Sequence, residues 1–98
     1  MTNKILAITT NKDIQIVLER LINEQWEGVV VSSLNECMNE LQNGQYAILL
    51  IGSGLEETEE LKLEEYVRTN GSGLKIVKHY GGGSGLLTAE IHQALEDH

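Results

Sequence analysis

The chain has 98 residues, a length that suits one domain built around one core. Its formal net charge is −8, from 15 acidic and 7 basic residues, and a field of that sign repels phosphate backbones and anionic lipid surfaces. We therefore exclude nucleic acid and membranes as partners and expect a basic or neutral protein surface instead.

The chain has a single cysteine, Cys37, so no internal disulfide can form. No Cys/His cluster has the spacing of a metal site. No stretch approaches the roughly 20 apolar residues of a membrane-spanning helix, and MTNKILAITT lacks the layout of a signal peptide. These features predict a cytoplasmic protein that holds neither a metal nor a cofactor.

The first half of the chain alternates between strand and helix patterns. The apolar run 4–9 (KILAIT) predicts a buried strand. Apolar residues then recur at helical spacing over 13–25, where Thr10 or Asn11 can cap the helix. The valines at 29–31 predict a second strand.

The middle of the chain repeats the alternation. Ser33 opens S-L-N-E, a capping box for a second helix that Gly44 ends. The continuous apolar run 46–51 (YAILLI) predicts a central strand buried on both faces. Ser53 opens a sequence that resembles another capping box, and it precedes a third helix over 56–69. We expect that helix to turn four apolar side chains inward, namely Leu61, Leu63, Tyr66 and Val67.

The last quarter supplies one more strand and one more helix. Residues 74–79 (LKIVKH) alternate more than the third strand does, which places them nearer an edge of the sheet. Residues 81–85 (GGGSG) read as a loop, and 86–96 read as a helix. The order βαβαβαβα with short loops predicts right-handed crossovers, a parallel sheet and helices on both faces, in one domain over 1–98.

Two segments carry a resemblance to a known family. KILAITTNKDI resembles the start of response-regulator receiver domains, and QYAILLIGSGL resembles their third strand. The resemblance implies a three-layer α/β/α, flavodoxin-like fold with four parallel strands in the order 2-1-3-4. It also implies that this receiver-like domain is truncated, since a fifth strand with its essential Lys is missing.

The functional residues of that family do not carry over. Thr9 and Thr10 stand where receiver domains have metal-binding acids, and Gly52 stands where they have the phosphorylated Asp. Tyr80 falls near their switch Ser/Thr position. Mg²⁺ prefers carboxylate oxygens, and a glycine has no side chain to phosphorylate. The sequence therefore predicts a pseudo-receiver, a signalling or protein-interaction module with no catalytic residue.

The loops at the carboxyl ends of the strands form the candidate site, because ligands of open α/β sheets sit there. These loops are polar, small and rich in glycine. The candidate ligand-binding residues are Thr9, Thr10, Asn11, Gly52, Ser53, His79, Tyr80, Gly81, Gly82, Gly83, Ser84 and Gly85.

The segment HYGGGSG allows two interpretations. A Gly-rich turn that leads into a helix can present backbone N–H groups to a phosphate or carboxylate, with Ser84 and His79 adding donors. Alternatively, the glycines allow a tight path and Ser84 caps the helix. The segment matches neither the P-loop nor the dinucleotide fingerprint. A hydrolase that uses His79 as a base is the least favoured reading, because the chain offers no obvious nucleophile or orienting acid beside it.

Three further features have structural interpretations. Trp26 is expected to fill the end of the core opposite the site, and Cys37 is expected to act as a small hydrophobe. The acidic run 56–60 is expected to be solvated, with docking of a basic partner as the alternative. A missing fifth strand uncovers an edge, which favours a homodimer or another protein partner.

Overall fold

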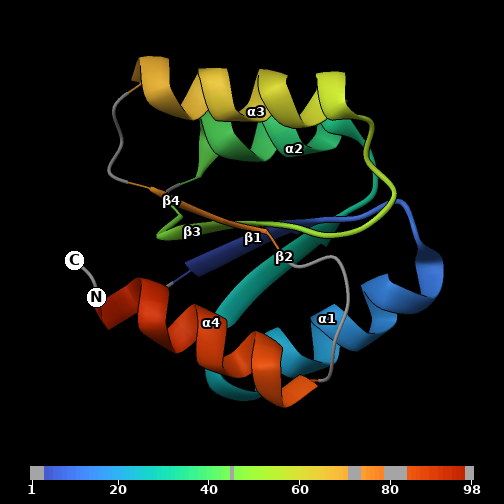
Figure 1. The fold of residues 1–98 in the computed structure, drawn as a ribbon, viewed down its shortest axis with the longest axis vertical. Helices are drawn as coiled ribbons and strands as arrows, with labels where there is room; N and C mark the ends of the chain where they lie inside the picture. Colours follow the sequence, from blue (N-terminus) through green and yellow to red (C-terminus); the bar gives the residue numbers. More distant parts are fainter. Residues whose placement is uncertain (1–3, 45, 71–73, 79–83, 97–98) are drawn as a thin grey trace.

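A computed structural model describes residues 4–44, 46–70, 74–78 and 84–96, with the backbone alone for 84–88. Strands and helices alternate along the whole described chain (Figure 1). They are β1 (Lys4–Ile8), α1 (Lys12–Gln25), β2 (Glu27–Val31), α2 (Leu34–Asn43), β3 (Ile48–Ile51), α3 (Glu57–Asn70), β4 (Lys75–Lys78) and α4 (Ser84–Glu96). The four strands pair in parallel in the order β2-β1-β3-β4, so the predicted fold class and strand order are confirmed.

The helices form two layers around the sheet. Helices α2 and α3 cover one face, and α1 and α4 cover the other (Figure 1). Right-handed crossovers explain the first three placements, because the β1-to-β2 connection runs in the opposite direction across the sheet from the β2-to-β3 and β3-to-β4 connections. None of the helices in the described part combines the length and apolarity that a membrane crossing requires.

The core lies on both faces of the two central strands. Every residue of β3 is 0% exposed, as the continuous apolar run predicted. Alternate residues of β1 and β3 point to opposite faces. Leu6 and Leu49 belong to the cluster under α2 and α3, whereas Ile5 and Ile48 belong to the cluster over α1 and α4.

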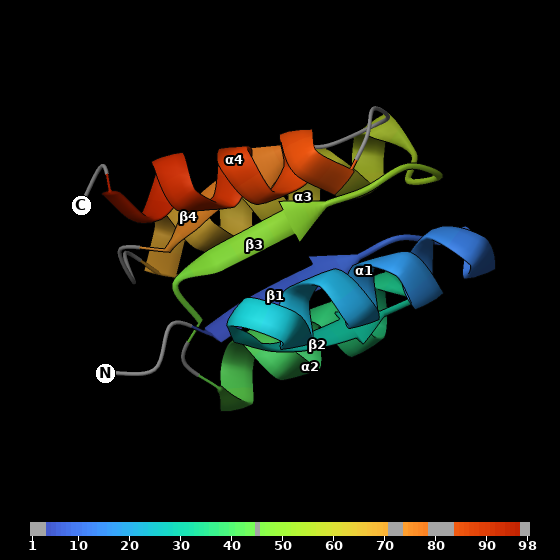
Figure 2. The ribbon, with the colours of Figure 1, turned by 90° about the horizontal axis from the view of Figure 1, so that it is seen from below.

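Strands β2 and β4 are the edges of the four-stranded sheet, which confirms the expected edge position of 74–79 (Figure 2). Strand β2 begins at Glu27, two residues earlier than the valines suggested. Strand β3 begins at Ile48 rather than at 46, although the Ala47 N–H already donates to the Lys4 carbonyl oxygen. Strand β4 ends at Lys78, and the predicted last strand residue, His79, lies outside the described residues.

The first two helix caps agree with the sequence. The side-chain oxygen of Asn11 accepts from the N–H groups of Asp13 and Ile14 and so caps α1. The Ser33 hydroxyl accepts from the Glu36 N–H and caps α2. The Glu36 carboxylate in turn accepts from the hydroxyls of Ser32 and Ser33.

The predicted capping box at Ser53 is wrong. Helix α3 begins at Glu57, and it is the Glu59 carboxylate that reaches back to the Glu56 N–H, at 3.0 Å. Ser53 belongs instead to a turn before the helix. The predicted inward orientation is confirmed for Leu63, which is 0% exposed, and is wrong for Leu61, which is 54% exposed.

Helix α4 begins at Ser84, two residues before the expected start. Ser84 and Gly85 are therefore helical and do not belong to the predicted loop. Ile91 is buried and Ala94 and Leu95 are partly buried in the cluster between α1, α4 and the sheet, so α4 has one apolar face that packs inward.

Trp26 and Cys37 take the places expected of them. Trp26 precedes β2, packs on the cluster over α1 and α4, and contacts the His92 ring at a centroid distance of 5.0 Å. Cys37 lies on the inner face of α2 and is fully buried. The His92 Nε2 atom also lies 3.0 Å from the Gln25 Oε1 atom and links α4 to the end of α1.

Candidate functional site

The carboxyl ends of β1 and β3 lie side by side. The two strands pair in parallel, with Ile8 opposite Ile51, so the residues that follow them meet at one end of the sheet. Thr9 follows β1 and Gly52 follows β3. The structure thus brings together two of the positions that the sequence selected.

Thr9 is fully buried, and its hydroxyl is used within the protein. The hydroxyl donates to the Ser53 carbonyl oxygen at 2.8 Å and accepts from the Asn11 N–H at 3.2 Å. Thr9 therefore ties the end of β1 to the turn after β3, across 44 residues of sequence.

Gly52 lies directly against Thr9. A Cβ atom at position 52 would lie 3.0 Å from the Thr9 Cβ and 3.3 Å from the Ile8 carbonyl oxygen. The Gly52 N–H donates to that same carbonyl at 2.8 Å. A side chain at this buried position would require Thr9 to shift by a few tenths of an ångström, and a carboxylate would also lose its hydration.

The turn after Gly52 closes over the β1 end. Gly54 has a φ of 96°, in the region that glycine alone adopts readily. A Cβ there would collide with the Thr10 hydroxyl. The Thr10 N–H donates to the Ser53 carbonyl at 3.4 Å, so backbone and side-chain contacts both hold the two loops together.

Asn11 is exposed, but its side-chain oxygen is occupied as the cap of α1. The remaining candidates come from the segment after β4. His79, Tyr80, Gly81, Gly82 and Gly83 lie outside the described residues. Of Ser84 and Gly85 the structure gives the backbone, which forms the start of α4.

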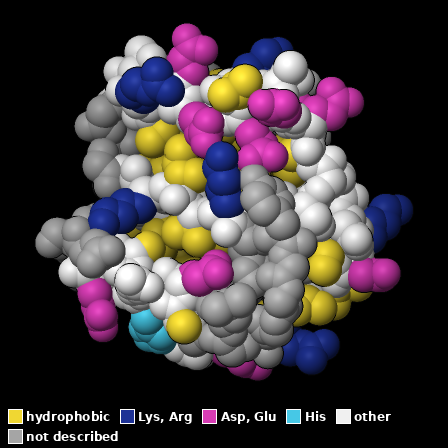
Figure 3. Space-filling model, viewed as in Figure 1, with side chains coloured by type: hydrophobic (Ala, Val, Ile, Leu, Met, Phe, Trp, Pro, Cys, Tyr) yellow, Lys and Arg dark blue, Asp and Glu magenta, His cyan; other side chains and the backbone are white. Residues whose placement is uncertain are grey.

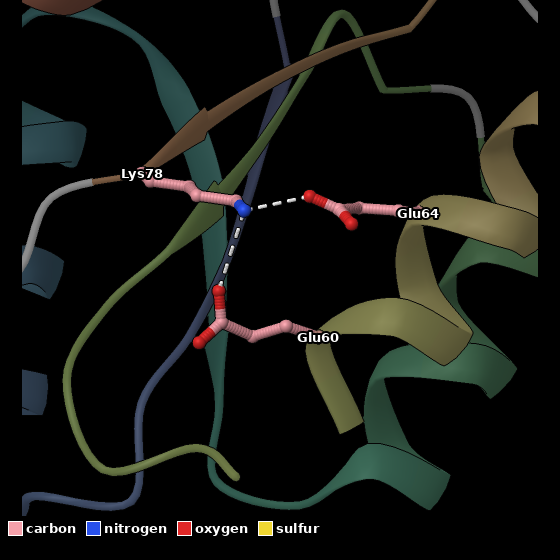
Figure 4. Close-up of polar contacts among 3 residues, drawn as sticks. All are labelled: Glu60, Glu64 and Lys78. Atoms are coloured by element: carbon pink, nitrogen blue, oxygen red, sulfur yellow. Dashed lines mark ion pairs between the residues drawn. The ribbon is translucent and has the colours of Figure 1, made fainter. Parts of the chain in front are cut away.

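A charged cluster joins α3 to β4, and the sequence interpretation missed it. The Lys78 Nζ atom lies 2.7 Å from the Glu64 Oε1 and 3.6 Å from the Glu60 Oε1 (Figure 4). Glu60 and Glu64 are spaced by four residues and so share one face of α3. That spacing, followed by a lysine at the end of the next strand, is the signal that could have predicted the cluster.

The described residues contain no group of three or more His, Cys, Asp or Glu side chains placed to hold a metal ion.

Two titratable groups on the inner side of α2, the Cys37 thiol and the Tyr46 hydroxyl, have raised pKa values. Burial raises the pKa of the Cys37 thiol from its ordinary 9.0 to about 12, and the charge of Glu40 acts in the same direction. Burial, with the hydrogen bond that the Tyr46 hydroxyl donates to Glu40, raises the Tyr46 pKa above its ordinary value.

An open groove lies between α2 and α3 on the outer surface. Its volume is about 300 Å³. Met38 of α2 and Tyr66 of α3 contribute apolar surface to it. Its remaining lining residues are Lys62, Glu65, Thr69 and Asn70.

The fold is that of signal receiver domains. The signal receiver domain of a protein described as a LuxO repressor, from Vibrio parahaemolyticus, is similar with a TM-score of 0.83 and 6% identity. The similarity covers 99% of this chain and 92% of that one. A response regulator receiver modulated diguanylate cyclase from Pelobacter carbinolicus is similar with a TM-score of 0.73 and 14% identity, over 97% and 93% of the two chains.

At the level of sequence, no family model and no curated protein matches the chain. The likeness is therefore one of fold, and it confirms the receiver-like architecture that the two sequence segments suggested.

Proposed function

We propose that this protein is a non-catalytic pseudo-receiver, a signalling or protein-interaction module that is not phosphorylated on Asp. One observation carries the proposal: the ends of β1 and β3 hold Thr9, Thr10 and Gly52 in place of carboxylates. A receiver fold with these uncharged residues lacks, at the ends of β1 and β3, the carboxylate ligands that Mg²⁺ prefers and an Asp that could accept a phosphoryl group.

The packing at this end supports the proposal further. The Thr9 hydroxyl is bonded to Ser53, and a Cβ on Gly52 has no room without a shift of Thr9. The ends of β1 and β3 are thus occupied by the protein's own atoms. A lone buried cysteine suits a reducing compartment, which supports a cytoplasmic location.

The test is incubation of the protein with acetyl phosphate and Mg²⁺, followed by intact-mass measurement and thermal unfolding. We expect no phosphoryl adduct and no specific change in the unfolding midpoint. A stoichiometric adduct on one residue, or a midpoint shift that requires Mg²⁺ and acetyl phosphate together, would contradict the proposal.

A second candidate function is the binding of a small phosphate- or carboxylate-bearing ligand. Helix α4 begins at Ser84, directly after the glycine run, so the amides of its first turn follow that run without an intervening segment. Thermal unfolding with phosphate, nucleotides, coenzymes and small carboxylates tests this function. A ligand at about 100 times its Kd adds roughly 2.7 kcal/mol, and each kcal/mol moves the midpoint of a small domain by about 4–8 °C.

An interaction module requires a binding partner, which is either another protein or a second copy of this chain. The strong negative charge of −8 favours a basic or neutral protein surface over nucleic acid or an anionic membrane. Light scattering at working concentration tests the homodimer, which predicts twice the mass of the chain.

A further inference from the structure

The outer face of α3 exposes a leucine between two acids. Leu61 is 54% exposed, the highest exposure among the large hydrophobic residues of α3. Glu57 and Glu65 lie four residues before and after it, so the three side chains form one stripe along the helix. Figure 3 shows hydrophobic atoms over α3 with both acidic and basic side chains around them.

The groove between α2 and α3 borders this stripe. Glu65 belongs to both, because it lines the groove beside Met38 and Tyr66. The stripe and the groove therefore form one surface, in which apolar area is bordered by the carboxylates of Glu57 and Glu65, while Lys62 also lines the groove. We call it the α3 surface, made of Glu57, Leu61, Glu65, Met38 and Tyr66.

The acids of α3 differ in how far their charge is compensated. Glu60 and Glu64 face Lys78, and Glu59 bonds to the Glu56 N–H at the start of the helix. Glu57 and Glu65 have no ion pair within the part of the chain that the structure describes. The negative charge that α3 leaves without an ion pair thus lies on both sides of Leu61, and Lys62 adds one positive charge at the groove.

We propose that the α3 surface docks a basic amphipathic helix of another protein, one that presents an apolar side chain to Leu61 and the groove and a Lys or Arg to each of Glu57 and Glu65. This inference rests on the proposed function, since it names the partner of the interaction module. The partner chemistry follows from charge complementarity, which fixes orientation and suppresses wrong partners.

The spacing of the stripe favours a helical partner. Glu57 and Glu65 are eight residues apart, which is about 12 Å along a helix. A partner helix with Lys, Leu and Lys at positions i, i+4 and i+8 has the same spacing and the opposite charges. This arrangement is related to the helix-in-groove mode of recognition, in which an amphipathic helix lays its apolar face into a groove.

The probe is a synthetic alanine-based helical peptide with Lys, Leu and Lys at positions i, i+4 and i+8. Its control peptide has Glu in place of both Lys residues. Titration of the ¹⁵N-labelled protein should move the amide signals of α3 and α2 with the Lys peptide only. Raising the salt concentration should weaken this binding, because the flanking charges are exposed.

Three variants sharpen the test. Leu61→Ser should weaken binding about tenfold, which is the effect of losing a central apolar anchor. The double variant Glu57→Lys with Glu65→Lys should lose the Lys peptide and gain the Glu peptide. The matched control, Glu19→Lys with Glu24→Lys on the exposed side of α1, has the same net charge and should keep the preference for the Lys peptide.

Equal binding of the Lys peptide by both double variants, or signal changes spread over the whole protein, would show general charge attraction and overturn the proposal. Absence of binding by the unaltered protein would overturn it as well. Either result leaves the absence of phosphoryl transfer standing, because that property is measured separately by mass. Conversely, a phosphoryl adduct would refute the pseudo-receiver without changing the peptide result.

Discussion

The carboxyl ends of β1 and β3 and the outer surface of α2 and α3 differ in what they offer another molecule. At the ends of β1 and β3, Thr9 and Gly52 are buried and uncharged, and the Thr9 hydroxyl donates to the Ser53 carbonyl oxygen. On the helices, Leu61 and two carboxylates face solvent beside an open groove. In open α/β sheets the strand ends are the usual place for ligands. Here the ends of β1 and β3 are filled from within, whereas the surface of α2 and α3 is accessible.

The largest effect is expected when an acid is introduced at the strand ends, because this region differs from the helix surface in having no room for a charge. Gly52→Asp places a carboxylate at a buried position against Thr9, so we expect a loss of about 3 kcal/mol or more in the free energy of unfolding. Urea unfolding measures the loss. Gly52→Ala is the control for steric strain alone and should lose less. If Gly52→Asp kept full stability, the strand ends would be open and the contrast would disappear.

The second prediction concerns the hydroxyl that closes the strand ends. Thr9→Val keeps the shape but leaves the Ser53 carbonyl and the Asn11 N–H without that partner, which should cost about 1–2 kcal/mol. Thr58→Val, at an exposed position in α3, should change stability by less than about 0.5 kcal/mol. Equal effects of the two substitutions in urea unfolding would show that Thr9 does not tie the loops together.

The inner side of α2 gives a third test, through pH. The folded protein holds the Cys37 pKa near 12 against an ordinary 9.0, mainly through burial. Above pH 9 the unfolded chain loses this proton while the folded chain keeps it, so stability is complete below pH 9 and falls as the pH rises toward 12. The raised Tyr46 pKa acts in the same direction.

Urea unfolding between pH 7 and pH 10.5 measures this slope. Cys37→Ala lowers stability at every pH but should reduce the fall above pH 9, since one of the groups is removed. A constant stability across the range, or an unchanged slope in Cys37→Ala, would contradict the prediction. The same thiol should react with disulfide reagents only as fast as the protein unfolds.

The smallest effect is expected at the charged cluster between α3 and β4. Lys78→Met removes the ion pairs with Glu60 and Glu64, and because the Lys78 side chain is 42% exposed the cost should be only about 0.5–1 kcal/mol. High salt should shrink the difference. Lys62→Met, on the exposed side of α3, is the control. A loss above about 2 kcal/mol would mean that the cluster is a major support of the fold.

Much of the architecture could be predicted from periodicity. The run 46–51 has no charged residue, and its only polar group is the Tyr46 hydroxyl, so the run was expected to lie between two layers. Ser33 and Glu36 identified the start of α2, because local capping contacts depend on neighbouring residues only. The candidate site was less predictable. Thr9 and Gly52 were selected correctly as neighbours, but their burial and the bond from Thr9 to Ser53 depend on contacts across more than forty residues.

Helix α3 shows why some local predictions failed. Leu61 and Leu63 are two positions apart, which is about 200° around a helix, so one helix cannot turn both toward the sheet. Leu63 packs in the core with Leu49 and Ile51, and Leu61 therefore lies on the surface. The false capping box at Ser53 has a similar origin, since the turn with Gly54 packs on Thr10 and delays the helix to Glu57.

The sequence by itself determined the elements, the burial of the central strand and the charge of the surface, because these follow from local periodicity and composition. Once the strand order is given, handedness also places α1, α2 and α3. Only the tertiary structure decided the face covered by α4, because no further strand in the described part follows it to impose a crossover. It also decided that the strand ends are closed and that Leu61 is exposed. Both outcomes depend on which distant side chains fill the same space.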